Sequence, residues 1–266
     1  MTAGREESEG SEVRVETRAG VMTVTLADVG NRNALGAALL QGIHDAIASA
    51  NADDAVRAVV ITNEGNTFCA GANLKQQSGA QAGDHPAVGF EEVLEAIQRS
   101  PTPIVGRIDG HVVGGGNGLA AALDISIASE DSKFGFTEVR LGVIPAIISV
   151  VCLPKMRRGE ALEAFMRGNR FPAARAVELG LINRAVPKDQ LDAAVGEVLA
   201  DLRKGGPTAV GLAKALVYDV PAMEQKDAFA YTARLSGELF RGEEAKEGMA
   251  AFLGKRKAAW AQESEE

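Results

Sequence analysis

The stretch VVGGGNGLAA, from Val112 to Ala121, carries three consecutive glycines and a fourth two residues later, directly ahead of a helical pattern. A strand pattern, PIVGRID, ends just before it, and another, LDISIAS, follows it. This order of strand, glycine turn, helix and strand is typical of an α/β fold. Glycines at such a turn can cradle a phosphate, bring backbone N–H groups to a reacting atom, or permit close packing of two elements.

The same alternation extends in both directions along the chain. Upstream, VRVETRAGVMTVTLAD predicts a hairpin that turns at Ala19–Gly20, and NALGAALLQGIHDAIASA predicts an amphipathic helix. VRAVVITNEG predicts a buried strand, and GFEEVLEAIQRS predicts a helix that Pro101 ends. Downstream, KFGFTEVRLG predicts a strand leading into a turn, RGEALEAFMRG and PAARAVELG predict helices, and LINRAV predicts a strand.

After about residue 188 the patterns are helical, with Pro207 and Pro221 between them. We therefore expect an α/β core over residues 13–205 and a helical C-terminal region over residues 206–266. Residues 1–12 are polar and acidic, with almost no apolar side chains to bury, and are expected to be a disordered tail.

Composition narrows the class of protein. The 266 residues carry a net charge of −8, which disfavours binding to nucleic acid or to an anionic membrane. The N-terminus lacks the basic and apolar regions of a signal peptide, and two cysteines make no disulfide framework. The apolar stretch LGVIPAIISVVCLP is broken by Pro145 and is shorter than the roughly 20 residues that span a bilayer. We expect a soluble, cytoplasmic protein.

Several kinds of site are disfavoured by the motifs. Gly114 and Gly116 are followed by Leu119 where a dinucleotide fingerprint needs a glycine, and no lysine follows the glycines as in a P-loop. No metal-binding motif of the H-E-x-x-H or C-x-x-C kind occurs, so no metal is expected. Cys69 could be a thiol nucleophile, but a small buried residue is the favoured interpretation.

Backbone donors are the stronger candidates. FCAGANL and GGGNGL are glycine-containing turns that each follow a strand and precede a helical pattern. The first N–H groups of a helix have no intrahelical partner, so two facing turns could direct two donors at one oxygen and form an oxyanion hole. The alternative is that the glycines only permit tight turns and close packing.

Glu138 is the candidate acid/base. It lies in the apolar stretch FGFTEVRLG, between Thr137 and Val139. A carboxyl group in apolar surroundings has a raised pKa, which suits it to proton transfer. The alternative is that Glu138 pairs with Arg140 or caps the next turn.

Together these stretches resemble the crotonase (enoyl-CoA hydratase/isomerase) superfamily. The matching stretches are NRNAL (31–35), FCAGANLK (68–75), DGHVVGGGNGLAAALDI (109–125), KFGFTEVRLGVIPA (133–146), RGEALEAFMRGNRFPAARAVELGLINRAVP (158–187) and EEAKEGMAAFLGKRK (243–257). The resemblance implies a spiral of strand–strand–helix turns, and C-terminal helices that build a homo-oligomer, a trimer or hexamer. It also implies an acyl-CoA thioester substrate and no separate cofactor, because coenzyme A is part of the substrate.

The resemblance also implies roles for individual residues. The N–H groups of Ala72 and Gly115 would hold the thioester oxygen, with Glu138 as the acid/base. The residues implied along the path of coenzyme A are Arg32, Ala34, Ala70, Ala72, Asn73, Leu74, Lys75 and Gly115, together with Phe252 and Lys255, a C-terminal pair that often comes from a neighbouring subunit.

Two positions depart from the family pattern. Family hydratases usually carry a second glutamate where this chain has Gly118, and an aspartate where it has Asn73. The glycine would leave room for a branched or carboxylated acyl group, and Asn117 could orient the water in a hydration that uses one glutamate. The sequence therefore favours an enoyl-CoA hydratase. The alternatives are a Δ3,Δ2-enoyl-CoA isomerase, a hydratase of a branched glutaconyl-type thioester, and a CoA-binding scaffold without catalysis.

Overall fold

The computed structural model describes residues 12–74 and 87–261. The predicted disordered tail, residues 1–12, lies outside these ranges except for Glu12. Three successive turns of the chain each place one strand in a larger sheet, the next strand in a smaller sheet, and then a helix. They are β3 (Ala58–Asn63), β4 (Thr67–Cys69) and α3 (Phe90–Arg99); β5 (Ile104–Ile108), β6 (His111–Val113) and α4 (Gly115–Ala122); and β7 (Ile125–Ser129), β8 (Lys133–Gly135) and α5 (Ala146–Cys152). The predicted α/β class and its strand–strand–helix spiral are confirmed.

The larger sheet has the strand order β1-β2-β3-β5-β7-β10. Its remaining strands are β1 (Val13–Arg18), β2 (Val21–Leu26) and β10 (Arg184–Val186). The hairpin of β1 and β2 turns at Ala19 and Gly20, as predicted, and both have the positive φ that a two-residue hairpin turn requires. All other neighbouring strands run parallel.

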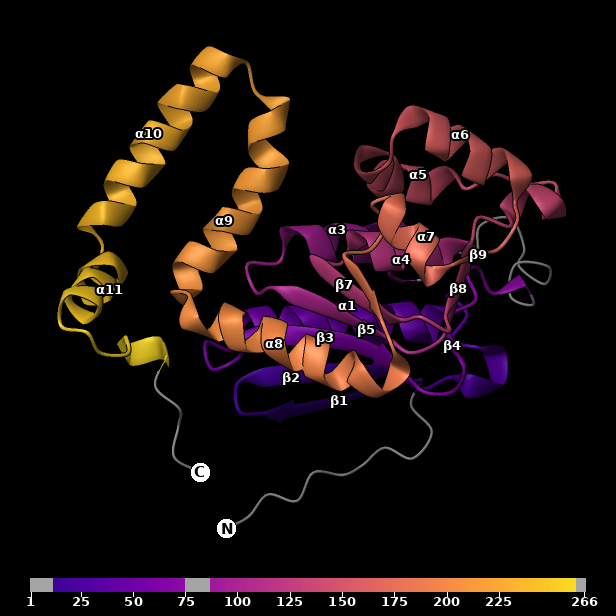
Figure 1. The fold of residues 1–266 in the computed structure, drawn as a ribbon, viewed down its shortest axis with the longest axis horizontal. Helices are drawn as coiled ribbons and strands as arrows, with labels where there is room; N and C mark the ends of the chain where they lie inside the picture. The colour runs from indigo at the N-terminus through magenta and orange to yellow at the C-terminus, as the bar shows by residue number, and fades with distance from the viewer. Residues whose placement is uncertain (1–11, 75–86, 262–266) are drawn as a thin grey trace, which may run out of the picture.

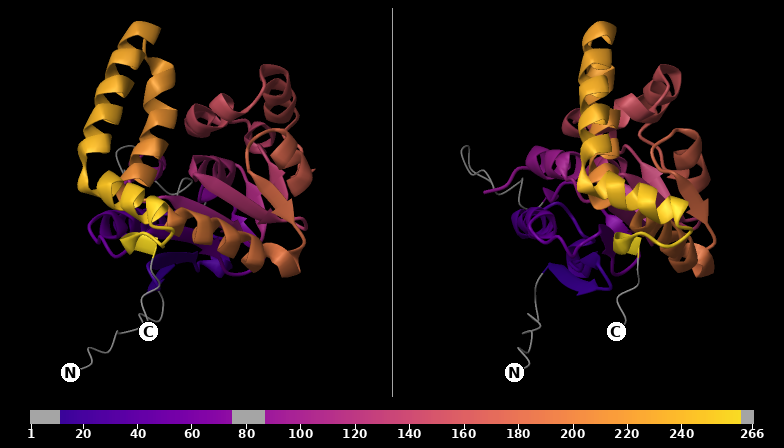
Figure 2. Two further views of the ribbon diagram at one scale, coloured as in Figure 1. Left: turned by 60° about the vertical axis from the view of Figure 1, so that its left-hand side comes forward. Right: turned by 90° about the vertical axis from the view of Figure 1, so that its left-hand side faces the viewer.

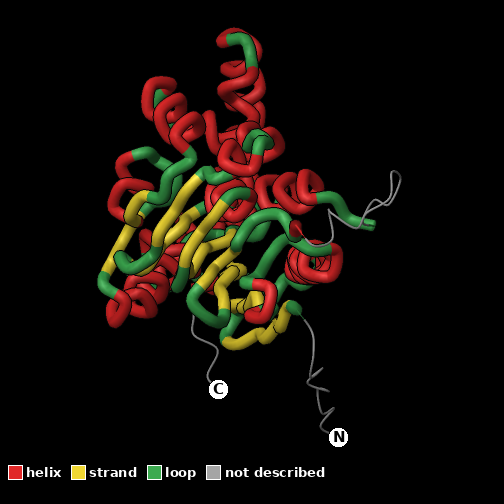
Figure 3. Tube along the Cα trace, turned by 90° about the vertical axis from the view of Figure 1, so that its right-hand side faces the viewer, coloured by secondary structure: helices red, strands yellow, loops and turns green. Residues whose placement is uncertain are grey.

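Helices cover both faces of the larger sheet (Figure 3). Val59 and Ile61 of β3 belong to the main core, which also holds the apolar faces of α1 (Ala37–Asn51) and α3. Val60 points to the opposite face and packs with α8 (Leu191–Lys204). A strand that is buried on both faces is typical of parallel sheets, and it explains why this stretch is continuously apolar in the sequence.

The smaller sheet has the order β4-β6-β8-β9, in which β9 (Phe171–Pro172) is antiparallel to β8. Between β8 and β10 the chain forms α5, α6 (Arg158–Arg167) and α7 (Ala173–Glu178). Phe134 and Phe136, which flank the end of β8, pack on Phe165 and Phe171 from these segments. This aromatic cluster fixes the start of the turn that carries Glu138.

The C-terminal arm, residues 207–253, consists of α9 (Pro207–Asp219), α10 (Gln225–Arg241) and α11 (Glu243–Leu253). Figures 1 and 2 show α9 and α10 projecting side by side away from the sheets. None of the residues of α10 is buried. Short 3-10 helices lie at Val29–Asn31, Glu138–Leu141, Leu153–Lys155, Lys188–Gln190, Val220–Ala222 and Ala259–Ala261.

Some elements were not foreseen in the sequence. The short strands β4, β6 and β9 have two or three residues each, too few to display an alternating pattern. Helix α5 lies in the apolar run after Pro145, which has no clear helical period. The glycine run itself belongs to α4, which begins at Gly115 rather than after Gly118.

None of the helices within residues 12–74 and 87–261 combines the length and the apolar character that crossing a bilayer requires.

Candidate active site

Two glycine-containing turns meet at one edge of the smaller sheet. Strands β4 and β6 pair in parallel, so the turns that follow them leave the sheet at the same end. Gly71 has φ +83°, and a Cβ on it would lie 2.8 Å from both the backbone N of Gly115 and the carbonyl O of Val113. The two turns are therefore in contact, and a side chain at residue 71 would separate them.

Each turn offers a backbone donor. Gly115 is the first residue of α4, so its N–H has no carbonyl of its own helix to bind. Neither this N–H nor that of Ala72 has a hydrogen-bond partner within the described ranges. Ala72 is exposed, and Gly115 is partly exposed. Both N–H groups are thus available to a carbonyl oxygen that enters from solvent.

The segment Arg32–Leu35 supports the first of these turns. The N–H of Ala70 donates to the carbonyl of Arg32 at 3.1 Å, and the N–H of Leu35 donates to the carbonyl of Gly71 at 2.8 Å. Leu35 also forms a parallel bridge with Ala72. The structure therefore brings Arg32 and the buried Ala34 next to the turn, as the resemblance implies.

Glu138 lies beside the second turn. A Cβ on Gly114 would lie 3.5 Å from Oε1 of Glu138, which places the carboxyl group next to the residue that precedes Gly115. Oε2 of Glu138 is buried and accepts no hydrogen bond from the described residues. Burial raises the pKa of Glu138, and its own backbone N–H partly opposes the shift. The predicted alternative, an ion pair with Arg140, is wrong: the structure contains no such contact.

The space beside Gly118 is filled. Gly118 is fully buried in α4, and a Cβ on it would lie 2.2 Å from Cγ2 and 2.7 Å from Cβ of Ile148 in α5. Contacts that short do not occur between real side chains. The expectation that Gly118 leaves room for a larger acyl group is therefore wrong, because Ile148 occupies that room.

Asn117 holds the glycine turn to the smaller sheet. Its Nδ2 donates to the carbonyls of Gly114 at 3.0 Å and Gly135 at 2.9 Å, and the side chain is buried. Both amide hydrogens are used in this way, whereas Oδ1 of Asn117 is buried and has no hydrogen-bond partner among the described residues. That oxygen is the atom left to accept a hydrogen bond from water, so the role of Asn117 in orienting a water stays a prediction. The side chain also links α4 to the end of β8, next to the turn of Glu138.

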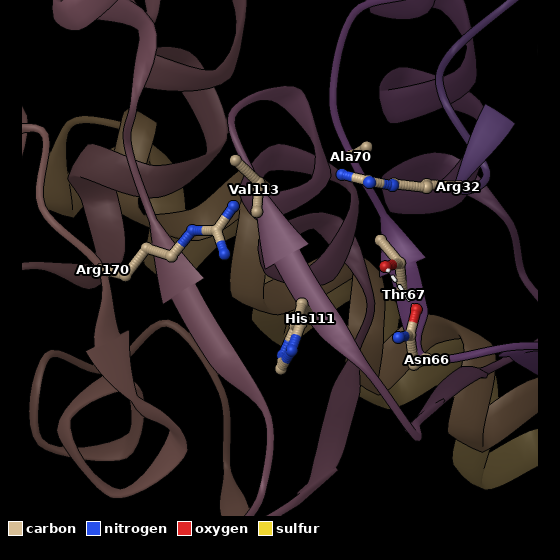
Figure 4. Close-up of a pocket in the computed structure, with 7 residues that line it drawn as sticks. All are labelled: Arg32, Asn66, Thr67, Ala70, His111, Val113 and Arg170. Carbon is tan, nitrogen blue, oxygen red and sulfur yellow. Dashed lines mark hydrogen bonds between the residues drawn. The ribbon is translucent and has the colours of Figure 1, made fainter.

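A basic pocket of about 340 Å³ lies on the two segments that lead into the donor turns. Ala70 and Val113 line it, as do the side chains of Arg32, His111 and Arg170 (Figure 4). Figure 4 shows Arg32 and Arg170 pointing toward one another from opposite sides. Neither arginine has an ion-pair partner in the part of the chain that the structure describes.

The surroundings of His111 and Cys69 indicate a structural role for each side chain. Nδ1 of His111 accepts a hydrogen bond from the N–H of Lys133 at 3.2 Å, and burial, followed by the positive charges of Arg170 and Lys133, lowers its pKa. Cys69 is completely buried, and burial raises its pKa to about 12. Because the side chain is 0% exposed and no substrate can reach the thiol, the structure contradicts the alternative role for Cys69 as a nucleophile. Across the described residues, no three His, Cys, Asp or Glu side chains cluster as metal ligands would.

The remaining predicted residues lie either directly after Ala72 or near the end of α11. Asn73 and Leu74 follow Ala72 directly, and Leu74 is exposed. Lys75 lies outside the described residues. Phe252 and Lys255 are exposed near the end of α11, which lies at the opposite end of the molecule from α4 and β8 (Figure 1). A single chain therefore does not bring this C-terminal pair to the other predicted residues.

Sequence reasoning missed two residues that the structure brings to this region. Arg170 lies between two predicted helices and carried no prediction of its own, and its place in the pocket results from the pairing of β8 with β9. Ile148 lies in an apolar run in which every residue has similar chemistry. No pattern in the sequence distinguishes it from its exposed neighbour Ile147.

Comparison with known proteins agrees with this fold. Residues 16–263 match the model of the family described as "Enoyl-CoA hydratase/isomerase". The chain is 32% identical over 231 residues to "Crotonyl-CoA hydratase" of Syntrophomonas wolfei, which covers 85% of this chain and 88% of that protein. Among solved structures, Pseudomonas aeruginosa AtuE has a TM-score of 0.89 at 33% identity, covering 94% of this chain and 100% of the other. An enoyl-CoA hydratase of Mycobacterium smegmatis has a TM-score of 0.88 at 29% identity, covering 94% and 99%. The fold is the crotonase fold, and the chain belongs to the enoyl-CoA hydratase/isomerase family.

Proposed function

We propose that the protein is an enoyl-CoA hydratase that adds water to a 2-enoyl-CoA thioester with Glu138 as its single acid/base. The observation that carries this proposal is the contact between the two donor turns, with the Glu138 carboxyl group beside Gly114. The names of the relatives, among them a crotonyl-CoA hydratase, support hydration as the reaction.

In this reaction the thioester oxygen accepts hydrogen bonds from the N–H groups of Ala72 and Gly115. These donors stabilise the negative charge that develops on that oxygen as the enolate forms. The Glu138 carboxylate takes a proton from water while the water oxygen bonds to C3, and then delivers the proton to C2. Water is thereby added across the double bond, and Glu138 returns to its starting state.

The basic pocket is suited to the phosphate groups of coenzyme A. Arg32 and Arg170 point into it without ion-pair partners among the residues described, in a protein of net charge −8. Charge-assisted hydrogen bonds to phosphate are the strong kind that such a ligand would use. The pocket lies on the same two segments as Ala72 and Gly115, which is consistent with one thioester extending across both.

A second candidate activity is Δ3,Δ2-enoyl-CoA isomerisation. This reaction needs one base that removes a proton at C2 and returns it at C4, so a single carboxylate suffices. The observation that favours it is that residue 118 has no side chain and that Ile148 fills its place.

One experiment separates these candidates. Purified protein is given a 2-enoyl-CoA and, separately, a 3-enoyl-CoA, while the absorbance of the conjugated thioester is followed. Loss of the 2-enoyl absorbance supports the hydratase, and gain of absorbance from the 3-enoyl substrate supports the isomerase. A Glu138→Gln variant is expected to lose about 10²- to 10⁴-fold in kcat/KM.

If neither substrate reacts across chain lengths and branched acyl groups, glutaconyl-type thioesters included, the catalytic proposal is overturned. The CoA-binding scaffold would then be the remaining function. Full activity in Glu138→Gln would overturn the assignment of the acid/base alone.

We also propose that the protein forms a homo-oligomer through the C-terminal arm. Several large apolar side chains of the arm are exposed in the single chain, namely Val217, Phe229, Phe240, Met249, Phe252 and Leu253. An exposed apolar surface of this kind marks an interaction site. A neighbouring copy could then supply Phe252 and Lys255 to the coenzyme A path, which a single chain does not do.

A further inference from the structure

The contact between α4 and α5 carries a further inference, which rests on the proposed function. Gly118 lies in the middle of α4 and faces α5, and Ile148 of α5 is 3% exposed. The same two helices are linked by a second contact, in which Sγ of Cys152 donates to the carbonyl O of Asn117 at 3.8 Å. Ile148, Val151 and Cys152 are the buried residues of α5, so one face of this helix is directed at α4.

The contact at Gly118 is too close for any side chain. A Cβ at residue 118 would lie 2.2 Å from Cγ2, 2.7 Å from Cβ and 3.4 Å from Cα of Ile148. A rotation about χ1 would move Cγ2 but not Cβ, and isoleucine has little χ1 freedom in a helix. Only the loss of the whole Ile148 side chain brings this contact into the ordinary range.

The contact also lies close to the candidate acid/base. A Cβ on Gly114, which precedes Gly118 by four residues, would lie 3.5 Å from Oε1 of Glu138. Burial raises the pKa of Cys152, one turn after Ile148 in α5; the charge of Lys155 lowers it, and the charge of Glu138 raises it further. Oε2 of Glu138 is buried without a partner among the described residues. The wall next to Glu138 is therefore apolar and offers it no second titratable group from α4.

We infer that Ile148 is a specificity-determining residue: it takes the place of a side chain at residue 118, makes this wall of the acyl site apolar and leaves Glu138 as the sole proton carrier. A second carboxylate at residue 118 is compatible with this fold only when Ile148 is shortened to glycine. The glycine and the isoleucine are thus one steric unit formed by two helices.

A stability cycle tests the steric part without any assay of activity. Gly118→Ala is expected to lower the melting temperature by about 2–12 °C, as overpacking of a core does. In an Ile148→Gly background, Gly118→Ala is expected to lower the melting temperature much less than it does in wild type. In an Ile148→Ala background, which keeps the Cβ at 2.7 Å, Gly118→Ala is expected to lower it almost as much as in wild type. Gly196→Ala is the matched control, because Gly196 is an exposed residue in the middle of α8 with nothing within 4 Å of its Cβ position.

If Gly118→Ala does not lower the melting temperature, or if Ile148→Ala relieves its effect as fully as Ile148→Gly does, the steric inference is overturned. This outcome is independent of the proposed function, because it needs no substrate.

The catalytic part is tested with the double variant Gly118→Glu/Ile148→Gly against Ile148→Gly alone. Hydration of a short 2-enoyl-CoA is expected to rise about 10²-fold, at the lower end of what a positioned acid or base contributes. The pH profile of kcat/KM should acquire a second ionisation that Ile148→Gly lacks, which a change in packing alone would not produce.

A double variant that is folded but no faster than Ile148→Gly, with an unchanged pH profile, would overturn the assignment of this wall to the acyl site. If wild type and all variants are inactive while the stability cycle behaves as expected, the proposed function fails and the steric unit stands.

Discussion

Glu138 is a residue whose pKa links activity to stability. Burial raises this pKa, and only the deprotonated carboxylate can accept a proton. In the proposed reaction kcat/KM should therefore rise with pH through the raised pKa, above the usual carboxyl range. In the unfolded chain the same group loses its proton at lower pH, so the folded state loses stability as pH rises between the two values.

Glu138→Gln is expected to remove both effects, because the amide is neutral at every pH. The acidic limb of kcat/KM should disappear along with about 10²- to 10⁴-fold of activity. The variant should also become more stable than wild type as pH rises through that window, as measured by chemical denaturation at a series of pH values. Glu130→Gln, an exposed carboxyl outside the site, is the control. A Glu138→Gln protein whose stability follows wild type at every pH would contradict a raised pKa in the folded state.

Single residues were predictable where their surroundings in the sequence were unusual. Glu138 stood out because a carboxylate interrupts an apolar stretch, and Gly118 because of the family pattern. Ile148 and Arg170 could not be found in this way. An isoleucine in an apolar run and an arginine in a polar loop are ordinary in sequence, and their contacts arise only when α5 packs on α4 and β9 pairs with β8.

At the scale of elements, α9 depends on a buried ion pair for its position. Nζ of Lys214 lies 2.8 Å from Oδ2 of Asp124 and donates to the carbonyl of Ile97 at 2.7 Å. The two side chains are 9% and 15% exposed. Oδ2 of Asp124 also accepts the N–H of Ile104, at the start of β5. This pair fastens the base of the C-terminal arm to the larger sheet and to α3.

Lys214→Met is expected to lower the free energy of unfolding by about 3–5 kcal/mol, because it leaves a buried carboxylate without its cation. The measurement is chemical denaturation followed by circular dichroism. Arg234→Met is the matched control: its ion pair with Glu238 is exposed and should contribute at most about 0.5 kcal/mol. Adding Asp124→Asn should restore part of the loss. Equal effects of Lys214→Met and Arg234→Met would show that the buried pair does not hold α9.

Longer elements were predictable because their periodicity extends over several turns or pleats. The hairpin, α1, α3, β3 and the helices after β10 all lie where the sequence placed them. In the smaller sheet, β8 lies in the stretch KFGFTEVRLG, which the sequence predicts as a strand, but β4, β6 and β9 were not predictable as strands. With two or three residues each, they are defined by the parallel pairing of β4 with β6 and of β6 with β8, which only the folded chain provides.

At the scale of the whole molecule, exposed apolar side chains are most numerous in two parts of the chain that the structure describes. One apolar surface is on the C-terminal arm, and the other is on the segment 141–166, where Leu141, Val143, Ile144, Ile147, Val150, Leu153, Leu162 and Met166 are exposed. The two surfaces lie on different parts of the chain and Figure 1 shows α10 and α6 on opposite sides of the molecule. If the two patches bind each other between copies, the interface is heterologous, and it gives a ring where the rotation between copies closes. A ring of copies joined in this way would be a cyclic oligomer, such as the trimer that the resemblance implies, rather than a two-fold dimer.

The wild-type chain of 27.7 kDa is therefore expected to sediment as a multiple of that mass. Phe229→Glu, in the second turn of α10, where the phenylalanine is 68% exposed, should shift the equilibrium toward the single chain, because an ionised carboxylate in an apolar interface costs several kcal/mol. Sedimentation equilibrium measures the mass, and the melting temperature should lose its dependence on protein concentration in the variant. Val15→Glu on strand β1 replaces an apolar residue that is 46% exposed and lies outside both surfaces, and should leave the mass unchanged. If Phe229→Glu keeps the wild-type mass while Val15→Glu lowers it, the assembly is built on the β1 side of the sheet, and the C-terminal arm is free to act within its own chain.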